Sequence, residues 1–165
     1  MVETVFVGGT PGASSEWNGS SPTKDLAFKI YPGKAGGWHS ADYIPHYIWY
    51  DFKRPLRPAK ISYLPYKPEG YGPPLGMANA LRIKNFQFIG TDDPVCEYNS
   101  NWTVLCEGDS RRYTSVYDEN GCTVATTTSY RGKFHCLGLR SLKRSAYNRE
   151  VGLRGIRIWQ IITES

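Results

Sequence analysis

Three polar side chains near residue 40 have the types and spacing of a metal site. His39, Asp42 and His46 follow the pattern H-x2-D-x3-H, and imidazole and carboxylate groups are common ligands of transition metals. We expect them on a loop that runs into a strand, where this spacing does not bring three side chains to one face. The pattern therefore predicts no metal site.

A second group of residues has the types found in catalytic pairs. His135 directly precedes Cys136, but neighbouring residues of a strand point to opposite faces, so they are not expected to share a proton. Asp92, Asp93 and Glu97 lie in a predicted turn, where solvated caps are the expected role. The sequence also lacks the Gly-x-Ser-x-Gly elbow, the HExxH helix and the phosphate-binding loop. The chain is therefore predicted to be non-catalytic.

Aromatic and apolar side chains in the Gly- and Pro-rich connections are stronger candidates for a site. A sugar site needs an aromatic face against which C–H groups stack, and a few fixed groups that hydrogen-bond the hydroxyls. His, Asp and Arg side chains are available for those hydrogen bonds. The candidate ligand-binding residues are His39, Asp42, Tyr43, Tyr66, Tyr71, Leu75, Arg82 and Arg140.

An aromatic strand is predicted directly after the first of these connections. Residues 47–52 hold four aromatic side chains and no Gly or Pro, which favours a strand. Alternate residues point to opposite faces, and the face without charge is taken as the core face. Lys53-Arg54-Pro55 is expected to end the strand. The core face would carry Ile48, Tyr50 and Phe52, and the outer face Tyr47, Trp49 and Asp51.

The rest of the chain predicts short strands joined by turns. Its 165 residues fit one domain, residues 1–165, and its 17 Gly and 11 Pro favour many turns. No run of ten or more residues has helical spacing of apolar side chains. The fold class predicted is therefore all-β. Further strands are expected at residues 5–7, 60–64, 81–90, 113–117, 123–128, 134–139 and 151–161.

Four cysteines lie in the second half of the chain, and none forms a CxxC pair. An even number in a small β-rich chain is compatible with two disulfides and an oxidising compartment. Of the three pairings, proximity in sequence alone favours Cys96–Cys106 and Cys122–Cys136. Sequons at Asn18 and Asn101 agree with secretion, although the first seven residues do not form a signal peptide.

Charge is unevenly distributed along the chain, whose net charge is +5. Residues 131–157 contain eight Lys or Arg against Glu150 alone. Such a segment could form a basic face for an anionic glycan, a phospholipid or a nucleic acid. It could equally be a solvated strand edge that Lys and Arg protect from pairing. No stretch of 18 apolar residues occurs, so no membrane-spanning segment is predicted.

Three stretches in order resemble the discoidin family, the coagulation factor V/VIII type C domains. They are the Trp turn at residues 37–40 with the strand at 47–52, the pair at 85–93 and 101–105, and the closing strand at 151–161. Tyr47 and Tyr50 stand where the family pattern has Trp and Val. The resemblance covers about residues 14–162 and implies an eight-stranded antiparallel jelly roll of the galactose-binding-like type. Trp38 is then expected to pack under the barrel mouth.

The resemblance also implies a function. Relatives bind a sugar or an anionic lipid head group through loops at one end of the barrel, and the Tyr-rich connections here favour sugar. The expectation is a non-catalytic, extracellular or secreted recognition module that binds carbohydrate and no nucleic acid. Two alternatives stay open: peripheral binding to anionic phospholipid, and a cell-adhesion or matrix module whose partner is a protein. No cofactor is expected. A structural calcium ion, which some relatives bind, stays an open alternative that the loop sequence does not support, because residues 31–37 lack the Asp of the calcium loop.

Overall fold

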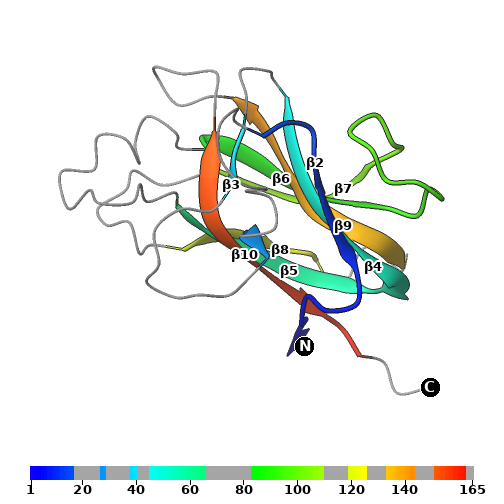
Figure 1. The fold of residues 1–165 in the computed structure, drawn as a ribbon. Coiled ribbons are helices and arrows are strands. Elements are labelled where there is room, and N and C mark those ends of the chain that lie inside the picture. Colours follow the sequence, from blue (N-terminus) through cyan, green and yellow to red (C-terminus); the bar gives the residue numbers. More distant parts are fainter. Residues whose placement is uncertain are drawn as a thin grey trace.

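Two antiparallel sheets form the molecule in the computed structural model (Figure 1). The structure describes residues 1–16, 27–28, 38–40, 45–65, 83–109, 119–125, 133–143 and 151–162, and for His39 and Lys143 only the backbone. Sheet A has the order β1-β10-β5-β8, with β3 also paired to β10, and sheet B has the order β2-β4-β9-β6-β7. The strands are β1 Val2–Glu3, β2 Thr10–Ala13, β3 Trp38–His39, β4 His46–Leu56, β5 Pro58–Pro65, β6 Asn85–Thr91, β7 Thr103–Asp109, β8 Asn120–Thr123, β9 Phe134–Lys143 and β10 Gly152–Gln160.

The predicted all-β jelly roll is confirmed. Every strand pairing in the described part of the chain is antiparallel. Strands β1 and β3 have two residues each, so eight of the ten described strands have four residues or more. The sheets enclose one main core to which both contribute fully buried side chains, among them Ile61, Phe88 and Ile158.

Strand β4 has the two faces that its alternation predicts. Ile48, Tyr50 and Phe52 are at most 5% exposed and belong to the main core. Tyr47 and Trp49 point the other way but are also buried, in a second cluster on the outer face of sheet B. The strand is therefore covered on both sides along half its length.

The prediction that Lys53-Arg54-Pro55 ends this strand is wrong. Strand β4 continues to Leu56, and its pairing with β9 shifts register between Asp51 and Leu56. Lys53 has a positive φ of 59°, and its backbone N–H donates to the Asp51 carboxylate at 2.9 Å. A bulge of this kind takes up the extra residues without ending the pairing. Leu56 returns to the core, 2% exposed.

Two predicted strands lie elsewhere along the chain. Residues 5–7 form no strand. The first strand is β1, Val2–Glu3, which pairs with the end of β10. Phe6 instead packs into the core, 5.0 Å from Phe28 and 5.7 Å from Phe52 between ring centroids. Of the strand expected at 123–128, Thr123 ends β8, Asn120–Thr123, residues 124–125 form no strand, and residues 126–128 lie outside the described residues. The strand expected at 113–117 lies outside the described residues.

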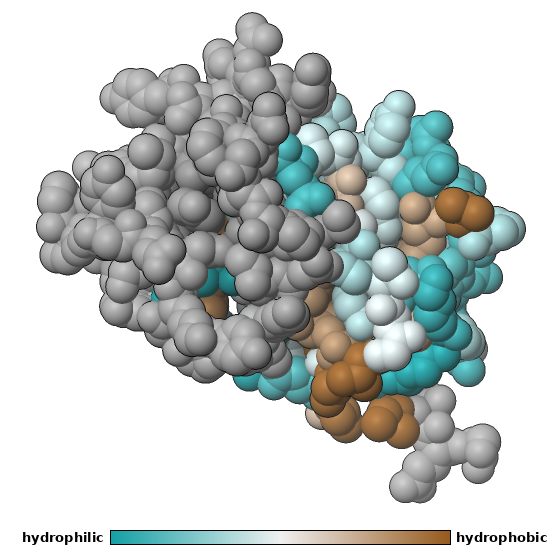
Figure 2. All heavy atoms as spheres, viewed as in Figure 1, coloured by the Kyte–Doolittle hydropathy of each residue, from teal (hydrophilic) through white to brown (hydrophobic). Residues whose placement is uncertain are grey.

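Exposed apolar side chains gather near the N-terminus. Figure 2 shows hydrophobic atoms along the lower edge of the molecule, where Figure 1 places the first strand. Val5 and Val7 are 64% and 69% exposed, in keeping with their position outside any strand.

Arg157 holds β1 to β10 through two contacts with the Glu3 carboxylate, at 2.7 and 2.8 Å.

Both disulfides join residues far from each other in sequence, and the pairing predicted from proximity is wrong. The bonds are Cys96–Cys136 and Cys106–Cys122. Thr91, at the end of β6, pairs with Cys136 of β9, so the connection that follows β6 leaves the sheet beside Cys136. Cys106 lies on β7 at one edge of sheet B, and Cys122 lies on β8 at one edge of sheet A. The second bond therefore joins the two sheets.

Candidate functional site

Two connections that carry the candidate residues leave sheet A at neighbouring positions. Gly152 and Leu153 at the start of β10 pair with His39 and Trp38 of β3. Leu153 also pairs with Pro65, the last residue of β5. The segments that begin after residue 40 and after residue 65 therefore start on either side of the same strand.

The same two connections enter sheet B at neighbouring positions. His46 at the start of β4 and Phe86 near the start of β6 both pair with Ser141 of β9. Tyr63, near the end of β5, donates through its hydroxyl to the Ile83 carbonyl at 3.4 Å. This end of the molecule, where β5 and β9 finish and β4, β6 and β10 begin, is called the loop end below.

A hydrogen-bonded base supports the loop end. The Ser40 N–H donates to the Val151 carbonyl at 2.8 Å, and the Val151 N–H donates to Ser40 Oγ at 2.8 Å. Trp38 is fully buried, and its indole N–H donates to the Ser15 carbonyl at 2.9 Å. The packing role expected for Trp38 is thus confirmed. A rigid base of this kind lets connections vary without disturbing the core.

Few of the predicted site residues fall within the described part of the chain. Arg140 is described in full, and His39 is described as backbone of β3. His46 is buried at the start of β4, 1% exposed. The other six candidate ligand-binding residues lie outside the described residues: Asp42, Tyr43, Tyr66, Tyr71, Leu75 and Arg82.

Arg140 points away from the main core, onto the outer face of sheet B. Its register partners are Tyr47 on β4 and Gln87 on β6. The guanidinium donates from Nε to Gln87 Oε1 at 2.7 Å and from Nη1 to the Tyr47 hydroxyl at 3.4 Å. It also lies over the Tyr47 ring, 5.6 Å from the centroid, and Gln87 in turn donates to Glu107 at 2.5 Å. These contacts hold Arg140 in one place close to the loop end.

Next to this polar row lies an aromatic cluster that the sequence reasoning did not identify as a candidate site. The Trp102 ring is stacked with the Tyr47 ring, 6.4 Å between centroids, and tilted against the Trp49 ring, 5.7 Å between centroids. Trp49 also lies flat against Gly12 of β2, where a Cβ would meet its ring at 2.3 Å. Tyr98 is 59% exposed and stands 6.5 Å from the Tyr47 ring. The alternation of β4 was the one sequence signal for this cluster, because it placed Tyr47 and Trp49 on the outer face. The residues that cover this face come from the distant connection 92–102.

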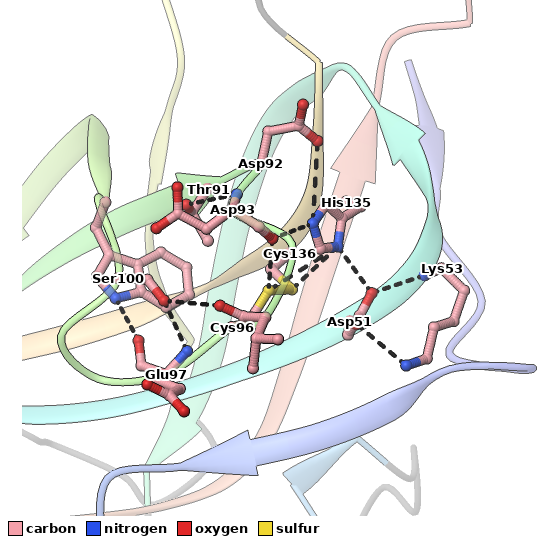
Figure 3. Close-up of a disulfide and its surroundings, with 12 residues drawn as sticks. Asp51, Lys53, Thr91, Asp92, Asp93, Cys96, Glu97, Ser100, His135 and Cys136 are labelled. Atoms are coloured by element: carbon pink, nitrogen blue, oxygen red, sulfur yellow. Dashed lines mark hydrogen bonds and ion pairs between the residues drawn. A yellow bond between two sulfur atoms is a disulfide. The ribbon is translucent and has the colours of Figure 1, made fainter.

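His135 stands at the centre of a third group, shown in Figure 3. Its Nδ1 lies 3.0 Å from Asp51 Oδ1, and its Nε2 lies 2.6 Å from the Asp93 carbonyl oxygen. The same Nδ1 is 3.4 Å from Cys136 Sγ and 3.9 Å from Cys96 Sγ. The imidazole therefore reaches its sequence neighbour, contrary to the expectation from strand alternation. Because both sulfurs are in a disulfide, neither is a nucleophilic thiolate.

The electrostatics of this group follow from its hydrogen bonds. Burial lowers the pKa of His135, but hydrogen bonds to Asp51 and to the Asp93 carbonyl outweigh it, so the pKa is raised. Burial likewise raises the pKa of Asp51, and hydrogen bonds from His135 and Lys53 outweigh it, so this pKa is lowered. The pair therefore favours its charged form.

Solved structures of discoidin-like, galactose-binding-like jelly rolls share the fold of this chain. One is a family 32 carbohydrate-binding module from Clostridium perfringens in complex with GalNAc-β-1,3-galactose. It has a TM-score of 0.67 and 15% identity, over 95% of this chain and 99% of that one. An F5/8 type C domain from Bacteroides fragilis has a TM-score of 0.66 and 12% identity, over 95% and 94% of the two chains.

A third match is a fucolectin from striped bass serum, with a TM-score of 0.66 and 10% identity, over 97% of this chain and 48% of that one. No family model and no curated protein sequence matches the chain. The likeness is therefore one of fold. Within the described residues no helix is long and apolar enough to span a membrane.

Proposed function

We propose that this chain is a non-catalytic, extracellular carbohydrate-binding module that holds its ligand at the loop end. The observation that carries the proposal is the fold itself, shared over nearly the whole chain with a module in complex with a disaccharide and with a fucolectin. The two disulfides support an oxidising compartment. The residues proposed to contact the sugar are His39, Asp42, Tyr43, Tyr66, Tyr71, Leu75, Arg82 and Arg140.

The strand register supports the choice of the loop end. Connections 41–44 and 66–82 start beside β10 and finish beside β9, so their flanking residues are neighbours at both ends. The second connection contains Tyr66, Tyr71 and the pair Pro73-Pro74. Proline restricts the unbound backbone and so lowers the entropy lost on binding. Aromatic faces in such a connection suit the C–H surface of a sugar.

Tyr71→Ala and His39→Ala test this position. Each is expected to weaken glycan binding about tenfold, or about 1.4 kcal/mol, because a stacking face or a hydrogen-bonding group is lost. The ligand is the best hit of a glycan array, and affinity is measured by titration calorimetry. The midpoint of unfolding should stay within error of the parent, since the proposal gives both side chains a role in binding and none in the core.

Two matched variants locate the site. Tyr98→Ala removes an exposed aromatic on the outer face of sheet B and should leave affinity unchanged if the loop end is the site. The double change Lys143→Gln and Arg144→Gln removes two charges of the basic segment and should not affect a neutral sugar. If Tyr98→Ala alone abolishes binding, the sugar site is on the sheet face. If the basic pair alone abolishes it, charge rather than aromatic stacking determines recognition.

Anionic phospholipid is the second candidate ligand, favoured by the eight Lys or Arg of residues 131–157. Basic residues near a membrane surface attract anionic lipids by about 1 kcal/mol each. Sedimentation with vesicles of phosphatidylserine and phosphatidylcholine, next to the glycan array, separates the possibilities. Sugar hits without pelleting support the proposal, pelleting without sugar hits supports the lipid, and neither result supports an adhesion module that binds protein.

A further inference from the structure

Four metal-ligating groups surround the Cys96–Cys136 disulfide. Asp51, Cys96, His135 and Cys136 each offer one ligand atom, and these atoms lie within 4.8 Å of one another. They come from three separate segments: β4, the connection 92–102 and β9. Figure 3 shows the imidazole between the two sulfurs and the carboxylate. The group is independent of the loop end.

The distances from His135 Nδ1 to the other three ligand atoms are close to those of a tetrahedral zinc site. With bonds of about 2.3 Å to sulfur and about 2.0 Å to nitrogen and oxygen, neighbouring ligand atoms lie roughly 3.3 to 3.8 Å apart. His135 Nδ1 is 3.0 Å from Asp51 Oδ1, 3.4 Å from Cys136 Sγ and 3.9 Å from Cys96 Sγ. A zinc ion would also require the two bonded sulfurs to separate.

The surrounding hydrogen bonds prepare the histidine and the carboxylate as ligands. His135 Nε2 lies 2.6 Å from the Asp93 carbonyl, which only accepts hydrogen bonds. The proton is thus held on Nε2, and in the neutral ring the lone pair is on Nδ1, which faces the sulfurs. A carbonyl behind the distal nitrogen is the usual second partner of a zinc-bound histidine. The Asp51 carboxylate accepts from the Lys53 N–H at 2.9 Å, with Lys53 Nζ 3.3 Å away.

We propose that reduction of the Cys96–Cys136 disulfide opens a zinc site formed by Cys96, Cys136, His135 and Asp51. A dithiol reductant gives two electrons and two protons to the disulfide, so the chain gains two thiols and the reductant becomes a disulfide. Zinc then binds both sulfurs as thiolates and releases two protons to water. The connection 92–102 stays attached to β9 in either state, by a covalent bond or by the metal.

Cobalt is the spectroscopic probe for this site. The whole chain is reduced without oxygen by a water-soluble phosphine, which takes up the oxygen of water as it opens both disulfides. The reduced chain should bind one equivalent of added Co²⁺. The complex should show a thiolate-to-cobalt charge-transfer band and the visible bands of tetrahedral cobalt. One equivalent of Zn²⁺ should displace the cobalt. A reduced chain that shows no such bands overturns the proposal.

The second cysteine pair is an internal control. Zn²⁺ should slow alkylation of Cys96 and Cys136 at least tenfold, as read by mass spectrometry of the peptides, while Cys106 and Cys122 react as without metal. His135→Gln keeps both thiols and should weaken cobalt binding at least tenfold, whereas Cys106→Ser with Cys122→Ser should leave it unchanged. Equal protection of all four cysteines, or full binding by His135→Gln, contradicts the site.

Loss of structure on reduction is also informative. If the reduced chain unfolds, zinc should restore the far-ultraviolet circular dichroism spectrum of the oxidised protein, because the metal replaces the lost cross-link. A reduced chain that stays unfolded with an equivalent of zinc rules the site out.

Asp51→Asn is a second variant. It preserves the size of the side chain and is expected to weaken metal binding by the reduced chain.

Discussion

His135 shows how two hydrogen bonds determine the charge of one residue. Both of its ring nitrogens face oxygen atoms, the Asp51 carboxylate and the Asp93 carbonyl. A neutral imidazole can donate from only one nitrogen, so its other lone pair would face an acceptor. In the oxidised protein the imidazolium satisfies both contacts, which is why the pKa of His135 is raised although burial opposes it.

The unfolding free energy should therefore depend on pH through this residue. A histidine whose pKa is raised by folding stabilises the folded state fully below its unfolded pKa, about 6.5, and the contribution is lost as pH rises through the folded pKa. Asp51, whose pKa is lowered, loses its contribution as pH falls below about 4. We expect stability to decline as the pH rises above about 6.5, measured by urea unfolding.

His135→Gln is the control for this pH dependence. It should be less stable than the parent at pH 6, and the difference between the two proteins should shrink as the pH rises. If the difference in unfolding free energy is the same at every pH, the surroundings of His135 do not raise its pKa.

At the scale of elements, β4 and the two disulfides connect most parts of the molecule. Strand β4 lies between β2 and β9, with the main core on one face and the aromatic cluster on the other. The Cys96–Cys136 bond fastens the connection 92–102 over that second cluster, which contains Trp102. The Cys106–Cys122 bond joins the two sheets.

Each disulfide should stabilise the chain according to the loop it closes. Sequence separations of 16 and 40 residues correspond to about 3 and about 4 kcal/mol in the chain-entropy description. Cys106→Ser with Cys122→Ser, and Cys96→Ser with Cys136→Ser, should lower the unfolding free energy by these amounts, measured with urea. Peptide mapping without reduction checks the pairing itself, and a Cys96–Cys106 peptide would contradict it.

The whole molecule is held by one core that both sheets share. Phe52 is 4% exposed, and its ring centroid lies 4.9 Å from that of Tyr50 and 5.7 Å from that of Phe6. It therefore joins the N-terminal segment to sheet B. The described strands therefore depend on one another and should unfold together.

Phe52→Ala should lower the unfolding free energy by about 3–5 kcal/mol, as truncation of a buried Phe does. Val7→Ala removes an apolar side chain that is 69% exposed and should change stability by less than about 0.5 kcal/mol. Both values come from urea unfolding followed by tryptophan fluorescence. Equal effects of the two changes would mean that the inner face of β4 is assigned incorrectly.

The sequence by itself determined the fold class and the local faces of the strands. The alternation in residues 47–52 placed Ile48, Tyr50 and Phe52 in the core, because side chains of a strand alternate whatever it pairs with. The resemblance to the discoidin family, carried by short stretches of sequence, indicated the packed Trp38 and the strand pair of β6 and β7. These features depend on residues close together in the chain, so their pattern can be read without the pairing partners.

Only the tertiary structure decided how distant strands meet. The register of β9 against β4 and β6 puts Arg140 between Tyr47 and Gln87 and puts Cys136 beside Thr91. That register sets the disulfide pairing and the contact of His135 with Asp51, and the bulge at Lys53 lets β4 continue to Leu56. Register between strands far apart in sequence follows from the packing of whole faces, and no local pattern contains it.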